Sequence, residues 1–180
     1  MNVRANTLQG SDELEILWWP DDTLGEKCEP VGEVTEEIRQ LARSMIFTMI
    51  AAPGLGLAAP QVGVLKRLVV VDPAADEENS GGEPFAMINP VIIQSSGEVI
   101  DEEGCLSMPG IYADIARPEE LTVEYTSAEG GIERLNTRGF MARCVAHEID
   151  HLNGVLFWDH LNKFKRDWLK LRFKRKSATV

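Results

Sequence analysis

Residues 137–151 read TRGFMARCVAHEIDH and end in the H-E-x-x-H motif His147-Glu148-Ile149-Asp150-His151, which holds two of the three histidines of the chain. On a helix, residues four apart lie on one face, one turn above each other. Two imidazoles in this arrangement can bind one metal ion, and Glu148 stands beside the first, where it can take a proton from a water that the metal activates. The motif therefore predicts a metal-dependent hydrolase built around this helix.

The flanking residues predict an apolar, inward face for the helix. Phe140 and Cys144 fall on the same stripe as the two histidines, at spacings of three and four residues. Asn136 or Thr137 can cap the start, and Asn153-Gly154 supplies a left-handed stop. A metal on this face would be partly shielded from water, which strengthens its effect on a bound substrate.

A catalytic site of this kind usually has three protein ligands, so one more is expected from another part of the chain. Cys144 shares the helical face, but it lies seven residues before His151, about 10 Å away along the axis. Metal bonds are only about 2 Å long, so one helix is a poor source of all three ligands. The open candidates are Cys28, Cys105, His160 or a carboxylate.

Two peptidase classes with the same helix need a ligand that this chain lacks. In one, the motif extends to H-E-x-x-H-x-x-G-x-x-H, but Phe157 stands where the last histidine belongs. In the other, a glutamate follows on a later helix, and no glutamate follows His151. Cys105 remains, in the segment Glu103-Gly104-Cys105-Leu106-Ser107. Its glycine suits a close backbone approach, and its glutamate can accept a hydrogen bond from an imidazole.

The segment Gly54-Leu55-Gly56-Leu57-Ala58-Ala59-Pro60-Gln61 matches the dinucleotide-binding pattern G-x-G-x-x-A in letters only. That pattern needs a strand before it and a helix after it. Here an expected helix over 35–51 precedes it and an expected strand over 67–72 follows it, which argues against nucleotide binding. A loop of small apolar residues can instead line a hydrophobic pocket, with the amide N–H of Gln61 offered to a developing oxyanion.

The segments GLGLAAPQ, EGCLS and HEIDH, in this order and near these spacings, resemble the three motifs of the peptide deformylase family. The resemblance covers about residues 14–165, and it continues in Glu15-Ile16-Leu17 with Pro20-Asp21, Ile88-Asn89-Pro90, Pro109-Gly110, Arg117-Pro118 and Gly154-Val155-Leu156-Phe157. It implies a hydrolase that removes the N-formyl group from the formylmethionine of newly made polypeptides and releases formate.

The resemblance also implies a role for each matching residue. The metal ligands are Cys105, His147 and His151, with water in the fourth position. Glu148 is the general base and then the general acid, and Gln61 forms the oxyanion hole with the backbone N–H of Leu106. Arg117 lies near the peptide-binding rim, and Gly56 lines the cleft with its backbone. The methionine pocket is bordered by Leu55, Phe140, Cys144 and His147, and Gly54, Glu103 and Gly104 complete the expected substrate-binding residues.

The ion that the resemblance implies in cells is Fe²⁺, and Zn²⁺, Ni²⁺ or Co²⁺ are also accommodated. Two residues depart from the family pattern. Asp101 stands where related chains often carry an apolar residue near the pocket, and Ala146 stands where a glutamine is common. We expect little consequence from Ala146.

Composition agrees with one catalytic domain over residues 1–180, expected in the cytoplasm. The hydrophobic fraction of 44% is enough for a core. The three cysteines form no C-x-x-C pair, so no disulfide framework is indicated. The first sixteen residues contain no apolar run of the kind found in signal peptides, and no later run is long enough to span a membrane.

Charge is concentrated at the C-terminus. Residues 163–180 carry eight Lys or Arg and one Asp, a net +7 on a chain of −11, so the rest carries −18. Phe164, Trp168 and Leu171 recur at helical spacing there, which predicts a basic amphipathic helix over about 163–176. Such a helix either packs on the body with solvated charges or contacts an anionic surface such as ribosomal RNA, without reading a nucleic-acid sequence. The catalytic motifs lie upstream, so we expect its removal to leave hydrolysis of short peptides largely intact.

The remaining pattern predicts an α+β fold, with antiparallel or mixed sheets wrapped around the metal-binding helix and a helix toward each end of the chain. Strands are expected over 67–72, 85–93, 97–101, 111–115, 121–125 and 131–136, with a polar loop over 74–83.

Two other function classes stay open. A zinc endopeptidase would use the same helix, but the missing third histidine and glutamate count against it. A catalytically silent protein that binds nascent chains or ribosomes is the other, and the intact Glu148, Gln61 and ligand set count against that.

Overall fold

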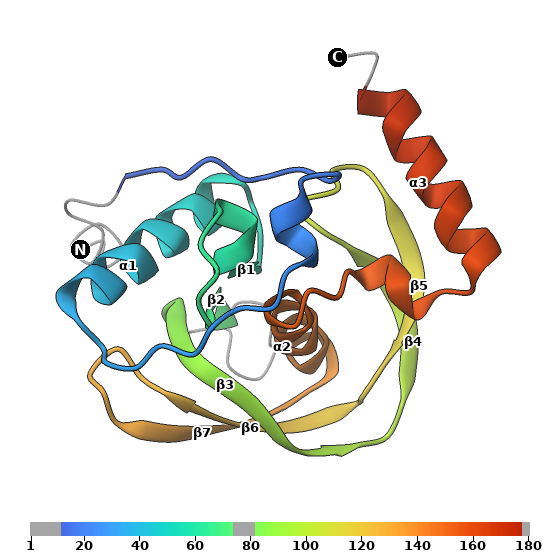
Figure 1. The fold of residues 1–180 in the computed structure, drawn as a ribbon. Coiled ribbons are helices and arrows are strands. Elements are labelled where there is room, and N and C mark those ends of the chain that lie inside the picture. The colour runs from blue at the N-terminus through green and yellow to red at the C-terminus, as the bar shows by residue number, and fades with distance from the viewer. Residues whose placement is uncertain (1–11, 74–81, 178–180) are drawn as a thin grey trace.

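The computed structural model describes residues 12–73 and 82–177, and Figure 1 shows helix α2 (Gly139–Leu152) at the centre, surrounded by the other elements. One antiparallel sheet has five strands, in the order β1 (Gly56–Ala58), β2 (Leu68–Val71), β3 (Phe85–Ser96), β6 (Glu120–Thr126) and β7 (Ile132–Arg138). A second sheet is the hairpin of β4 (Val99–Gly104) and β5 (Tyr112–Arg117). The other helices are α1 (Glu36–Ala51) and α3 (Lys163–Ser177).

Strand β2 shows how the sheet is held between two helices. Successive side chains of a strand point to opposite faces. Leu68 and Val70 belong to the core cluster that contains the buried residues of α1, whereas Val69 and Val71 belong to the cluster that contains those of α2. All four side chains are buried, so the uninterrupted apolar run reflects a strand that is covered on both faces. Helix α2 therefore packs directly on one face of the sheet.

The predicted ends of α2 are partly confirmed. The helix stops as expected, because Asn153 is the C-cap and Gly154 adopts a left-handed φ of +71°. Its start differs from the prediction. Asn136 and Thr137 lie in β7, where Thr137 pairs with Leu121 of β6, and Arg138 is the N-cap without a side-chain hydrogen bond. Strand pairing has therefore taken the residues that were expected to cap the helix.

The predicted α+β fold, with sheets around the metal-binding helix and a helix toward each end of the chain, is confirmed. The expected helix over 35–51 is α1, and each expected strand has a counterpart among β2 to β7. Strand β3 runs three residues further than predicted, and β1, which lies inside the glycine-rich segment, was not predicted. The polar loop expected over 74–83 and the polar N-terminal segment lie largely outside the described residues.

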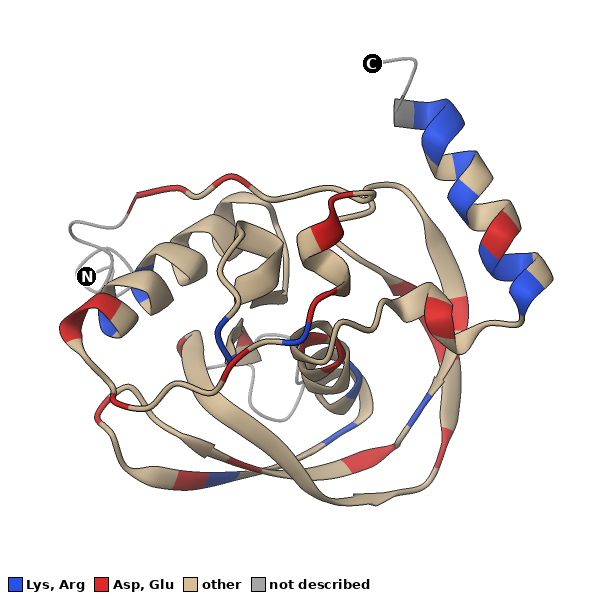
Figure 2. Cartoon of the chain, in the orientation of Figure 1, with Lys and Arg blue, Asp and Glu red and all other residues tan. Residues whose placement is uncertain are grey.

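Helix α3 leaves the body along one side and carries a dense row of Lys and Arg (Figure 2). The residues that anchor it are Leu169 and Phe173, which are buried with Met108, Ile111 and the rings of Phe157 and Trp158. The predicted apolar stripe faces solvent instead, since Phe164 is 87% exposed and both Trp168 and Leu171 are 57% exposed. Removing α3 would uncover this core, so we expect truncation to lower stability, and the expectation that hydrolysis of short peptides survives truncation stays a prediction.

Over residues 12–73 and 82–177, no helix combines the length and the hydrophobicity that a membrane span requires.

Candidate metal centre and active site

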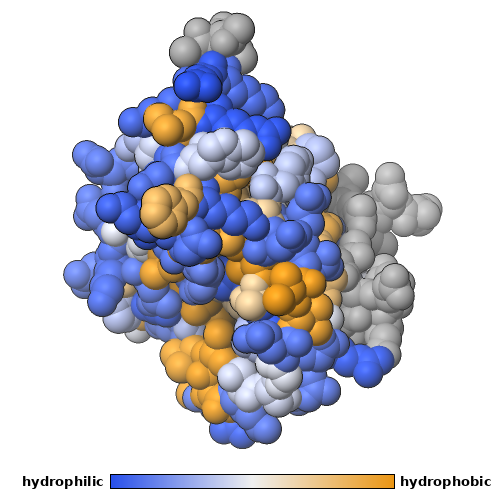
Figure 3. All heavy atoms as spheres, turned by 90° about the vertical axis from the view of Figure 1, so that its right-hand side faces the viewer, coloured by the Kyte–Doolittle hydropathy of each residue, from blue (hydrophilic) through white to orange (hydrophobic). Residues whose placement is uncertain are grey.

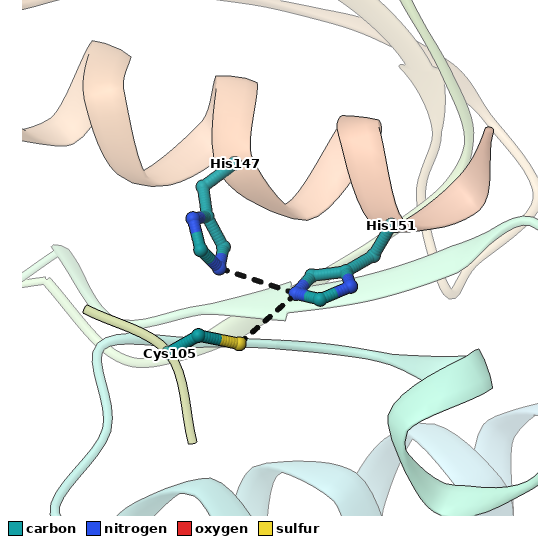
Figure 4. A group of neighbouring side chains, drawn as sticks. All are labelled: Cys105, His147 and His151. Atoms are coloured by element: carbon teal, nitrogen blue, oxygen red, sulfur yellow. Dashed lines mark hydrogen bonds between the residues drawn. The ribbon is translucent and has the colours of Figure 1, made fainter. Parts of the chain in front are cut away.

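Helix α2 and the turn after β4 bring together the three residues that the sequence singled out as metal ligands. In Figure 4 the imidazoles of His147 and His151 point from the helix toward the sulfur of Cys105. Sγ of Cys105 lies 3.2 Å from Nε2 of His151, which lies 3.1 Å from Nε2 of His147. All three donor atoms lie within 4.8 Å of one another, and among the described residues no other group of His, Cys, Asp and Glu converges in this way. One sulfur and two imidazole nitrogens this close together have the composition of a site that can hold one divalent ion.

The chemistry around the three donors suits a cation. Burial and the neighbouring His147 lower the pKa of His151 well below its ordinary value, so this imidazole is neutral, which is the form that binds metals. Burial opposes protonation of His147 as well, but the Cys105 sulfur, Glu103 and Glu148 outweigh it and raise the pKa of His147 well above its ordinary value. The same negative neighbours would stabilise a bound divalent ion in place of that proton.

Glu148 lies beside these donors without joining them. Its carboxylate is buried, and burial raises its pKa to about 7. Among the described residues, its Oε2 has no hydrogen-bond partner. A Cβ at Gly56 would overlap the Glu148 side chain, so glycine at that position leaves room for the carboxylate. A buried, unpaired carboxylate with a pKa near neutrality is suited to proton transfer.

Gln61 reaches the same place from the single 3₁₀ turn Ala59–Val62. Its Oε1 accepts a hydrogen bond from the backbone N–H of Ala58 at 2.8 Å, which fixes the orientation of the amide. The Nε2 group then faces Sγ of Cys105 at 3.4 Å and Oγ of Ser107 at 3.2 Å. The side chain is 1% exposed, so its N–H donor is held in place beside the metal site.

A cavity of about 490 Å³ opens onto these groups. Its walls include most of the residues that were expected to contact the substrate or the oxyanion: Gly54, Leu55, Gly56, Gln61, Glu103, Gly104, Leu106, Phe140, Cys144, His147 and Glu148. Cys144 does not take part in the metal site, and its thiol donates to the carbonyl of Leu55 at 3.3 Å. Burial raises the pKa of this thiol well above its ordinary value, so it serves as a neutral wall of the cavity.

Glu103 lies both at the cavity wall and beside an imidazole, as expected from the sequence. It borders the cavity, and its Oε1 accepts a hydrogen bond from Nδ1 of His147 at 2.6 Å. Burial alone would raise its pKa, but hydrogen bonds from His147 and Arg117 outweigh burial and hold the pKa well below its usual range. Glu103 is therefore ionised and orients the ligand imidazole, since the ring must present Nε2 to the metal when Nδ1 is bound.

Arg117 lies away from the peptide-binding rim that the resemblance implied. It is buried on β5, behind the metal site, and does not line the cavity. Its guanidinium forms ion pairs with Glu103 and Asp150, and Asp150 also contacts His160. The two other cysteine and histidine candidates are likewise elsewhere: Cys28 is buried in the core beneath α2, and His160 is part of this ion-pair network.

Two features of the site were not predicted from the sequence. Arg143 is buried on α2 and donates to Glu103, and Ser107 is buried beside Gln61. The available signal for Arg143 was a charged residue four positions before His147, within an otherwise apolar stretch of helix. Asp101, which departs from the family pattern, borders a smaller pocket of about 160 Å³ that shares Phe140 and Arg143 with the main cavity.

A cysteine sulfur and two imidazoles beside a cavity, with a buried glutamate and a fixed amide donor next to them, are typical of a metal-dependent hydrolase. The family model of polypeptide deformylase matches residues 13–167. A peptide deformylase of Hydrogenovibrio crunogenus is 46% identical over 93% of this chain and 96% of its own length.

Solved structures give the same result. The peptide deformylase of Ehrlichia chaffeensis superposes with a TM-score of 0.87 at 42% identity, over 93% of this chain and 98% of that one. Its complex with actinonin superposes with a TM-score of 0.85 at 43% identity, over 92% and 98% of the two chains. The chain belongs to the polypeptide deformylase family. It is a metal-dependent amidohydrolase that removes the N-formyl group from the formylmethionine of newly made polypeptides and releases formate.

Proposed function

We propose that Cys105, His147 and His151 hold the catalytic metal ion, that Glu148 transfers the protons, and that Gln61 and the Leu106 backbone N–H bind the oxyanion. The observation that carries this assignment is that a buried base, Glu148, and a fixed donor, Gln61, line the same cavity as Cys105 and His147 of the three-residue donor group. Residues 1–180 would then act as one catalytic domain, because these side chains come from positions 61 to 151 and all meet at α2.

The proposed reaction begins at Glu148. A bound divalent cation would lower the pKa of water towards about 7 and polarise the formyl carbonyl. The Glu148 carboxylate accepts a proton from the attacking water, whose oxygen bonds to the formyl carbon. As the carbonyl oxygen gains negative charge, the Gln61 amide and the Leu106 N–H donate to it, and each such donor can contribute roughly 3 kcal/mol. Glu148 then gives its proton to the amine nitrogen, the C–N bond breaks, and formate leaves.

We infer that the methionine side chain lies in the part of the cavity bordered by Leu55, Phe140 and Cys144. These residues are apolar or neutral, and Phe140 at the start of α2 remains 50% exposed, where a substrate side chain could cover it. Burial of a flexible thioether chain against such a wall stabilises binding mainly through the hydrophobic effect. The backbone of Gly54, Gly56 and Gly104 would border the peptide.

The ion that we propose in the cell is Fe²⁺, with Zn²⁺, Ni²⁺ and Co²⁺ as substitutes. Mixed thiolate and imidazole donors suit these first-row ions, and iron is the ion that the resemblance to deformylases implies. All three cysteines are free thiols, and a reducing compartment such as the cytoplasm would preserve the Cys105 sulfur as a ligand. Iron content after purification without oxygen is the measurement that tests this assignment.

We further propose that the outer face of α3 binds the ribosome, where formylated nascent chains emerge. Phe164, Trp168 and Leu171 form an exposed row on this helix, and the guanidinium of Arg172 lies 5.6 Å from the Trp168 ring. Figure 3 faces the side where α3 lies and shows a mostly hydrophilic surface interrupted by hydrophobic patches of different size. The combination of a basic helix with exposed rings suits the phosphates and bases of RNA, and it requires no base-specific contact.

Reversing two charges on α3, Lys165→Glu with Arg172→Glu, should lower ribosome binding by more than about 10-fold at low salt and flatten its salt dependence, because fewer phosphate counterions are released. Cosedimentation at two salt concentrations measures this. Hydrolysis of a short formylated peptide should be unchanged, since neither side chain lines the cavity.

Two further variants separate docking from stability. Arg134→Glu reverses an exposed charge on β7 and should leave ribosome binding unchanged. Phe173→Ala should lower the free energy of unfolding by about 3 kcal/mol, because it empties a buried site. Equal cosedimentation of the parent and the α3 charge variant would show that the basic face is only solvated.

A further inference from the structure

Arg143 is a buried arginine on α2, four residues before His147, and it contacts none of the three metal-binding side chains by a hydrogen bond or ion pair within the described residues. Its guanidinium reaches across to the β4–β5 hairpin. Nη1 donates to Oε2 of Glu103 at 3.1 Å and to the carbonyl of Ile115 at 2.9 Å, and Nη2 donates to the carbonyl of Val99 at 2.9 Å. The side chain thus joins α2 to both strands of the hairpin.

The four hydrogen bonds of Glu103 show what this contact does. Oε1 accepts from Nδ1 of His147 at 2.6 Å and from Nη2 of Arg117 at 2.7 Å. Oε2 accepts from Nε of Arg117 at 3.0 Å and from Nη1 of Arg143 at 3.1 Å. With both oxygens bound on two sides, the carboxylate cannot rotate without breaking a charge-assisted bond, and one oxygen stays directed at His147.

Arg143 also contributes to the charge balance around Glu103. Arg117 is shared between two carboxylates, those of Glu103 and Asp150. Arg143 adds a second guanidinium, so that two positive groups face two negative ones in a region where Glu103 and both arginines are nearly inaccessible to water. Removal of one member would leave a buried carboxylate undercompensated, and such a group relaxes toward water or a new partner.

We propose that Arg143 is a positioning residue of the metal centre. By holding Oε2 of Glu103, it keeps Oε1 on Nδ1 of His147 and so keeps Nε2 of that imidazole facing Cys105 and His151. The inference rests on the proposed ligand roles and assigns Arg143 no contact with the reacting atoms.

The test uses full-length protein loaded with Co²⁺, whose visible absorption reports the geometry of its ligands. Arg143→Met should shift this spectrum and release the metal to a chelator about 10-fold faster, which lies within the range found for residues that orient metal ligands. The matched control is Arg39→Met. Arg39 also donates to a backbone carbonyl, that of Ala128, and pairs with a carboxylate, but it lies on α1, outside the metal-site cluster. Its removal should leave spectrum and release rate unchanged.

A purely structural clip between α2 and the hairpin would behave differently. If Arg143 had only that role, Arg143→Met would lower the free energy of unfolding but leave the spectrum and the release rate of the folded protein at the parent values. That result would overturn the proposal. Arg143→Lys keeps the charge but not the fork of donors, so it should release metal at an intermediate rate. If Arg143→Met does not fold, the release rate of Arg143→Lys tests the proposal instead. Release of the metal from Arg143→Lys at the parent rate would contradict the proposal.

A double variant identifies the route of the effect. In a Glu103→Gln background, Arg143→Met should add little to the release rate, because both changes act on one contact. An undiminished 10-fold effect in that background would show that Arg143 does not act through Glu103. None of these readouts depends on turnover. Formate release by the same parent preparation is assayed beside them, so a failure of the proposed catalytic roles is distinguishable from a failure of this inference.

Discussion

Replacing Cys105 by alanine should abolish tight metal binding and, with it, deformylation. Cys105 supplies the single sulfur among the three converging donors, and the two imidazoles that remain come from one helix turn and cannot complete a catalytic site alone. The parent protein should hold about one ion per chain, a ratio that follows from the single cluster of donors found in the described residues. Metal analysis after dialysis against a weak chelator measures the change.

The two other cysteines provide matched controls for this substitution. Cys144→Ala removes a thiol that also faces the cavity but donates to the Leu55 carbonyl, and Cys28→Ala removes a thiol in the core beneath α2. Both proteins should retain the metal, with a modest loss of stability at the buried Cys28. A Cys105→Ala protein that keeps full metal content and activity would refute the ligand assignment.

Glu148→Gln should keep the metal and lower kcat by about 10³-fold, within the range that general acid–base catalysis contributes. Glutamine has nearly the same shape and fits beside Gly56, but its amide cannot accept the proton of the attacking water. Because Glu148 is outside the donor cluster, the metal content should not change. Steady-state assays with a formylated tripeptide, together with metal analysis, separate the two effects.

The control for Glu148 is Glu37→Gln, which changes an exposed carboxylate in the first turn of α1 and should leave kcat and metal content at the parent values. Loss of metal together with activity in Glu148→Gln would show that Glu148 is a ligand or a structural residue. The general-base role would then have to be abandoned.

The sequence was most informative where local spacing determines geometry. Residues four apart on a helix share a face, so His147 and His151 could be paired before any tertiary contact was known. The chain segment of Cys105 could be recognised, but its approach to α2 depends on how β4 leads into the following turn. Likewise, the side chain of Gln61 could be assigned to the site, whereas its fixed orientation depends on the backbone of Ala58.

The orientation of the buried arginine side chains could not be predicted from the sequence. Arg117 lies in β5, where alternate side chains point to opposite faces, and the sequence does not say which face is the cleft. The structure turns it inward, onto Glu103 and Asp150. Arg143 was overlooked for another reason: its partners on β4 and β5 lie 28 to 44 residues away in the chain, so local spacing gives no sign of them.

Helix α3 shows that hydrophobic periodicity alone does not always predict which face of a helix packs on the body. Its sequence contains two sets of apolar residues at helical spacing, Phe164, Trp168 and Leu171 in one and Leu169 and Phe173 in the other. The larger set was the natural choice for the packed face. The body instead offers a pocket of aromatic and aliphatic side chains that the smaller set fills, and the larger set is left on the surface.

The central claim is that this site hydrolyses a formyl amide and no peptide bond. Metal-loaded protein incubated with formyl-Met-Ala-Ser should release formate and a free methionine amine in equal amounts, and the Met-Ala-Ser peptide should stay intact. Formate assay and mass spectrometry of the same sample measure both products. Cleavage between Met and Ala, or metal-loaded protein that releases no formate, would contradict the account.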